Sequence, residues 1–106
     1  MAKYLFLASY TTDGVKGLLK EGGTARRAAV DAMATSLGGS IESYYYAFGD
    51  HDLYIIADLA DNASAAAIAL TVGATGAAKV STTVLLTSAD VDAASQKMPA
   101  YRAPGR

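Results

Sequence analysis

Alternating side chains in four stretches of the chain predict four β-strands. The period of two is clearest over residues 3–10 and 40–48, where aromatic side chains recur at every second position. Residues 53–59 and 78–87 are also rich in β-branched and apolar side chains. In the first stretch both alternating sets are apolar, so we expect both faces of that strand to be covered.

Apolar residues spaced three and four apart predict helices between these strands. The strongest pattern runs from Thr24 to Leu37 and is followed by Gly38, a residue type that favours a helix end. A shorter helix of one or two turns precedes it, with Asp13 as the expected N-cap and a break at Gly22.

Two further helices are predicted in the second half of the chain. An alanine-rich helix covers residues 62–75, with Asp61 or Asn62 as its N-cap. A brief helix over residues 89–98, opened by Ser88 or Asp90, ends before Pro99.

The order strand, helix, strand, strand, helix, strand predicts an α+β fold of the ferredoxin-like βαββαβ type. Two helices then cover one face of a four-stranded antiparallel sheet, and a short C-terminal helix and tail follow. We expect residues 1–87 to form this domain, and residues 88–106 to pack on a neighbouring subunit through Met98 and Tyr101.

The sheet face opposite the helices is expected to be too apolar for a monomer. We expect one of two aromatic sets to lie there together with Tyr54 and Ile56, and a second copy of the chain to cover it. The two sets are Tyr4, Phe6 and Tyr10, or Tyr44, Tyr46 and Phe48.

Composition excludes several classes of function. Nine basic and ten acidic side chains are scattered along 106 residues and give a net charge of −1, which argues against a nucleic-acid partner. The chain has no cysteine, so thiolate metal sites and cysteine nucleophiles are excluded. No apolar stretch approaches the roughly 20 residues that cross a bilayer, and no leader pattern is present. We therefore expect a cytoplasmic protein without a membrane partner.

Five blocks of sequence resemble the GYD-domain family, a small bacterial and archaeal family placed among the dimeric α+β barrels. They are YTTDGVKGL, SLGG, SYYYAFG, the turn GDHD and LADNASAAAIAL. In the motif that gives the family its name, Gly49 and Asp52 match, and His51 stands where the family usually has tyrosine. The resemblance implies the fold and self-association through the sheet, and it brings no established reaction.

His51 and Asp52 are candidate catalytic residues. His51 is the only histidine, and it lies between Asp50 and Asp52 at a strand junction. As a general base it would be held by a carboxylate. The alternative is a turn in which Asp52 binds backbone N–H groups and His51 replaces an equally amphipathic tyrosine. One histidine without cysteine does not predict a metal site.

The remaining candidates are tyrosines. Tyr46 is a third candidate catalytic residue, and Tyr10, Tyr44 and Tyr54 are candidate ligand-binding residues of an aromatic pocket. The alternative role for all four is packing on a half-buried sheet. Arg26 or Arg27 would reach an anionic ligand, or else both lie on a solvated helix face.

Two functions follow from these patterns. The first is a binding or structural homo-oligomer with a small-molecule pocket between sheet and helices. The second, by analogy with the fold alone, is a cofactor-independent enzyme, a monooxygenase or isomerase acting on a small aromatic or quinone-like substrate. Neither hypothesis requires a cofactor.

Overall fold

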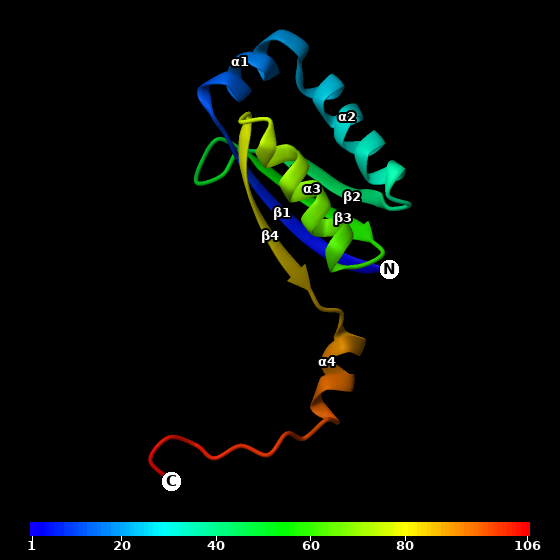
Figure 1. The fold of residues 1–106 in the computed structure, drawn as a ribbon, viewed down its shortest axis with the longest axis vertical. Helices are drawn as coiled ribbons and strands as arrows, with labels where there is room; N and C mark the ends of the chain where they lie inside the picture. The colour runs from blue at the N-terminus through cyan, green and yellow to red at the C-terminus, as the bar shows by residue number, and fades with distance from the viewer.

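The computed structural model describes residues 1–106 and confirms the α+β architecture (Figure 1). The sheet has the order β2-β3-β1-β4, and every neighbouring pair is antiparallel. The element order is consistent with a ferredoxin-like fold. The elements are β1 Ala2–Tyr10, α1 Thr12–Glu21, α2 Gly23–Ser36, β2 Ser40–Tyr46, β3 Leu53–Leu59, α3 Asn62–Ala74, β4 Ala78–Leu85 and α4 Ser88–Ser95.

The core lies between the sheet and the helices α2 and α3. Ala57 and Leu59 of β3 are completely buried, and Tyr4 and Phe6 of β1 are almost so. Tyr4 pairs with Ala57 across the ladder and Phe6 with Ile55, so their side chains point to the same face. This set supplies most of the apolar burial that holds the domain together.

Neither of the two aromatic sets expected on the open face is there, although Tyr54 and Ile56 do lie on that face. Tyr4, Phe6, Tyr44 and their neighbours pack under the helices, and Phe48 lies in the loop after β2, not in a strand. The physical reason is volume: the space under two alanine-rich helices is filled best by the large members of each alternating pair.

The face opposite the helices has a smaller apolar patch, which we call the open-face patch. By the alternation of the strands it comprises Leu5, Leu7, Tyr45, Tyr54 and Ile56. Tyr54 of β3 lies between Tyr45 and Leu7 in one row across the sheet, and Leu5 is opposite Ile56 in the next.

Ion pairs border the open-face patch at one end. The Lys3 ammonium lies 2.7 Å from Asp58 and 3.2 Å from Glu42. The hydrogen bond to Asp58, followed by that to Glu42, raises the pKa of Lys3. This end of the sheet is therefore polar, and the apolar part of the face is confined to its centre.

The N-caps of α1 and α4 differ from the sequence prediction by one to three residues. Thr11, not Asp13, caps α1, since its side chain accepts the Gly14 N–H. Thr87, not Ser88 or Asp90, caps α4, where Asp90 completes a capping box. Asp61 caps α3, one of the two predicted candidates, and the hydrogen bonds from Ser64 lower the pKa of its carboxyl.

The C-terminal segment leads away from the domain (Figure 1). No residue of α4 is buried, and the helix ends at Ser95, before the predicted end at Met98. Met98 and Tyr101 are 81% and 78% exposed. No helix in the structure is long and apolar enough to cross a membrane.

Candidate functional site

Asp52 fastens the loop between β2 and β3 to the central strand β1. Its carboxylate accepts the Tyr10 N–H at 2.7 Å, and its own N–H donates to the Ala8 carbonyl at 2.8 Å. The Asp52 carbonyl accepts the Ala47 N–H across the loop. These contacts favour the turn interpretation of Asp52, because its oxygens satisfy backbone donors at the end of a strand.

His51 is on the side of the open-face patch, away from the helices. Its Nδ1 lies 3.4 Å from the Ser9 hydroxyl, and its ring meets the Tyr54 ring edge-on at a centroid distance of 6.0 Å. No carboxylate forms an ion pair with it. His51 and Tyr54 are therefore together on one face, separated by the sheet from Tyr10, Tyr44 and Tyr46.

Tyr44 and Tyr46 lie on the helix side and share a hydrogen bond. Their hydroxyls are 3.3 Å apart, their rings meet edge-on at 5.3 Å, and the Tyr46 hydroxyl donates to the Gly23 carbonyl at 2.8 Å. The Arg27 guanidinium lies 5.6 Å above the Tyr44 ring, a cation–π contact. This pair joins the edge strand β2 to the start of α2.

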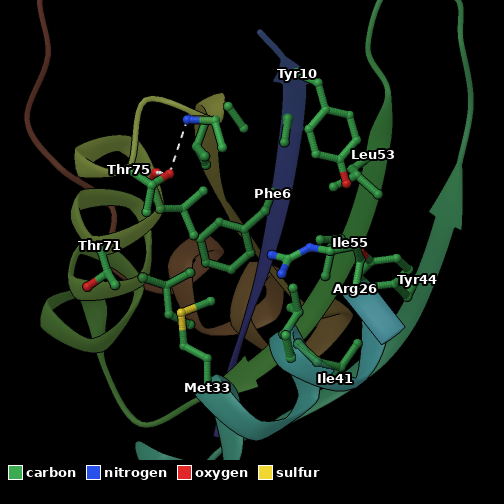
Figure 2. Close-up of a pocket in the computed structure, with 18 residues that line it drawn as sticks. Phe6, Tyr10, Arg26, Met33, Ile41, Tyr44, Leu53, Ile55, Thr71 and Thr75 are labelled. Carbon is green, nitrogen blue, oxygen red and sulfur yellow. Dashed lines mark hydrogen bonds between the residues drawn. The ribbon is translucent and has the colours of Figure 1, made fainter. Parts of the chain in front are cut away.

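A cavity of about 220 Å³ lies between the sheet, α2 and α3 (Figure 2). Eighteen residues line it, and fifteen of them are hydrophobic. Figure 2 shows Phe6 at its centre, with α3 on one side and α2 on the other. The lining residues are Phe6, Ala8, Tyr10, Arg26, Ala29, Val30, Met33, Ile41, Tyr44, Leu53, Ile55, Ile68, Thr71, Val72, Thr75, Ala77, Ala78 and Val80.

Ionisable side chains in the cavity lining are limited to Tyr10, Arg26 and Tyr44. Burial raises the pKa of both phenols, and a hydrogen bond with Tyr46 raises that of Tyr44 further. The charge of Arg26 acts on both in the opposite direction, so the three groups lie within electrostatic range of one another. Both phenols are neutral at physiological pH and serve as hydrogen-bonding groups.

A second, more polar pocket of about 250 Å³ lies beside α1. It adjoins the end of the cavity that contains Tyr10 and Arg26. It shares Tyr10, Arg26, Thr75 and Ala77 with the cavity and adds Asp13 and Glu21. The Arg26 guanidinium stands at the junction, 3.2 Å from Glu21. The cavity thus has an apolar interior and a charged entrance.

The structure separates the six predicted site residues into three groups. Tyr10 and Tyr44 line the cavity, with Tyr46 directly behind them. His51 and Tyr54 lie on the opposite face, and Asp52 is bound to the backbone of β1. The predicted combination of His51, Asp52 and Tyr46 around one reacting molecule is therefore not assembled within a single chain.

The sequence left open whether Arg26 or Arg27 would reach an anionic ligand, and Arg26 is the one that lines the cavity. It precedes Ala29, Val30 and Met33 by three, four and seven positions, so helical periodicity puts it on the same face of α2 as three cavity-lining residues. A charged residue in line with an apolar helix face is a candidate for a site entrance.

Strand order and the helix-covered cavity define the chain as an α+β protein of ferredoxin-like type. More specifically, it belongs to the GYD domain family, whose model matches residues 4–94. The match confirms the family that the sequence blocks indicated, and it extends through most of α4. Comparisons with curated proteins and with solved structures give no match.

Proposed function

We propose that this GYD domain protein is a self-associating binding protein that takes a small, mainly apolar molecule into the cavity between its sheet and helices. The observation that carries the proposal is the cavity itself: about 220 Å³, lined mostly by hydrophobic side chains, with a few polar groups that include Arg26 and Tyr10. Small-molecule sites commonly combine an apolar lining with a few placed polar groups.

Binding is favoured over catalysis by the chemistry of the lining. No histidine, carboxylate or lysine lines the cavity, so a base would have to come from outside it. The alternative, a cofactor-independent monooxygenase or isomerase acting on an aromatic or quinone-like substrate, is supported only by the neutral phenols, which are able to donate to a substrate oxygen.

Self-association through the open-face patch completes the proposal. Leu5, Leu7 and Ile56 occupy the centre of a sheet face that no element of the same chain covers. A second sheet packed on this face would give the dimeric α+β barrel that the family resemblance implies. We further propose that Met98 and Tyr101 anchor the C-terminal segment on the neighbouring subunit, since both are apolar and exposed on an extended tail.

The ligand proposal is tested by native mass spectrometry of the protein purified from its source. We expect a retained small molecule in the wild-type protein and its loss in Val72→Phe, which fills the cavity from α3. Leu70→Phe is the matched control, because Leu70 is on the same helix but 73% exposed. Retention of the same molecule by Val72→Phe, with its fold intact by circular dichroism, would exclude the cavity as the binding site.

A further inference from the structure

Arg26 is the single charged residue that lines the cavity. A guanidinium carries five N–H donors, and in the structure Arg26 makes one side-chain hydrogen bond, from Nη1 to Glu21 at 3.2 Å. Most of its donors are therefore uncommitted. Guanidinium groups bind carboxylates through two parallel hydrogen bonds, a geometry that a single contact to Glu21 does not use.

The hydrogen bonds of the tyrosines single out a second donor. Tyr46 gives its only hydroxyl hydrogen to the Gly23 carbonyl, so in its contact with Tyr44 it must be the acceptor. The Tyr44 hydroxyl hydrogen is therefore donated to the Tyr46 oxygen. The Tyr10 hydroxyl donates no hydrogen bond within the chain, so its hydrogen is free at the end of the cavity that contains Arg26.

Cavity size limits the molecule that these donors would hold. An apolar cavity of about 150 Å³ in another protein accepts benzene. The larger volume of about 220 Å³ leaves room for a ring and one small polar group, placed next to Arg26 and Tyr10. A molecule with a second charge would bury that charge against Phe6, Val30 and their apolar neighbours without a partner, which is strongly unfavourable.

We infer that the cavity selects a monocyclic aromatic carboxylate, whose carboxylate replaces Glu21 on Arg26 and accepts a hydrogen bond from Tyr10. The inference rests on the proposed function, because it names the class of ligand for the same cavity. In the structure Glu21 forms an ion pair with Arg26, so it would compete with the carboxylate of the ligand. Both partners of that ion pair are substantially exposed, so the pair is weak and readily exchanged.

The test compares benzoate with benzyl alcohol, a neutral probe of similar size, by isothermal titration calorimetry on the full chain. We expect benzoate to bind more tightly than benzyl alcohol. Arg26→Gln should weaken benzoate about tenfold to a hundredfold, the effect of losing a charged hydrogen bond, and leave benzyl alcohol unchanged. Arg26→Lys, which keeps the charge without the planar group, should fall between the two proteins.

Two further variants test whether Glu21 competes with the ligand and whether the effect of the charge is specific to position 26. Glu21→Gln should bind benzoate several-fold more tightly, because the internal competitor has lost its charge. Arg27→Gln is the matched control: it removes the same charge from the next residue of α2, one that pairs with Asp31 and does not line the cavity. Benzoate affinity should be unchanged in this control.

The outcomes separate this inference from the proposed function. Equal affinity for the two probes, or a benzoate affinity that Arg26→Gln and Arg27→Gln lower equally, would overturn the selectivity for a carboxylate and leave a binding cavity in place. If neither probe binds at millimolar concentration to any variant, the cavity does not accept a compact aromatic molecule, and the binding proposal is overturned with it.

Discussion

At the scale of single residues, Gly14 has the tightest surroundings of any glycine in the fold. It is the buried residue of α1, and an added Cβ would collide with the Ala77 carbonyl, a backbone atom that cannot turn away. The same approach lets the Thr11 N–H donate to that carbonyl at 2.9 Å. The junction of α1 with the start of β4 therefore depends on the absence of a side chain at position 14.

We expect Gly14→Ala to lower the free energy of unfolding by about 2 to 3 kcal/mol, the upper part of the range for overpacking. Gly17→Ala is the control in the same helix: nothing lies within 4 Å of its Cβ position, and alanine there should stabilise by about 0.5 to 1 kcal/mol. Urea denaturation measures both. A neutral Gly14→Ala would show that α1 moves freely away from β4.

The buried phenol of Tyr44 leads us to expect that the free energy of unfolding falls at high pH. Burial, and then the hydrogen bond with Tyr46, raises the pKa of its phenol, so the folded chain keeps this proton at pH values at which the unfolded chain releases it. The contribution is complete below about pH 10, the ordinary value for tyrosine, and is lost as pH rises above it. Tyr10 adds to the effect in the same direction.

Tyr44→Phe should therefore flatten the fall of the free energy of unfolding above about pH 10. The measurement is urea denaturation at a series of alkaline pH values. Tyr45→Phe is the control, since Tyr45 is the next residue of β2 and is 71% exposed. An equal slope in wild type and Tyr44→Phe would contradict a buried, neutral phenol at this position.

Site residues were harder to predict than the strands for a physical reason. Alternation shows which side chains share a face of a strand, but it does not show which face the helices cover. Tyr10 and Tyr44 were thus identified as candidates without a known side of the sheet. The separation of His51 from both tyrosines depends on how the loop after β2 turns, and Asp52 fixes that turn through contacts with β1, more than 40 residues earlier in the chain.

At the scale of elements, two helices have the same type of cap and different surroundings. Thr11 caps α1 and also donates to the Gly76 carbonyl at 2.7 Å, so it joins the helix to the rest of the fold. Thr87 caps α4, an eight-residue helix with no buried residue. The cap of α4 thus stabilises a helix that contributes no packing to the domain.

Thr11→Ala should lower the free energy of unfolding of the whole domain by about 1 to 2 kcal/mol. Thr87→Ala should leave that value unchanged and increase hydrogen exchange only in α4, because loss of the cap unfolds a helix that nothing else holds. Urea denaturation and hydrogen exchange distinguish the two. A domain-wide loss of stability in Thr87→Ala would mean that α4 packs on the fold in solution.

The sequence predicted strands and helices accurately where the periodic pattern covers many residues, and less accurately at the ends of the helices. The residues of β3 and the bulk of α2 and α3 follow directly from their patterns. The starts of α1 and α4 were displaced because serine, threonine and aspartate are near-equivalent N-caps, and three such residues lie within four positions at both places. Only the surrounding backbone decides which of them accepts the hydrogen bond.

At the scale of the whole molecule, the open-face patch should control assembly. We expect Leu7→Glu to shift the protein toward monomers, because the new charge lies in the middle of the face and would be buried by a second sheet. Leu70→Glu is the control, an exposed leucine on the outer side of α3. Size-exclusion chromatography with light scattering gives the mass; a wild-type monomer would contradict self-association altogether.

Removal of residues 98–106 tests the second proposed contact between subunits. If Met98 and Tyr101 pack on a neighbouring chain, the truncated protein should dissociate at a higher concentration than wild type, with an unchanged free energy of unfolding for the domain. The double substitution Met98→Ser and Tyr101→Ser should reproduce the effect in a chain of full length. Identical dissociation curves would show that the tail plays no part in assembly.

The central position of β1 has a consequence for how the chain reaches this structure. Of the four strands, β1 comes earliest in the sequence, and it pairs with β3 and β4, which begin only at residues 53 and 78. Contacts between residues so distant along the chain make folding slow. Until β4 emerges from the ribosome, one edge of β1 has no partner strand, a state that is prone to aggregation and suited to protection by chaperones.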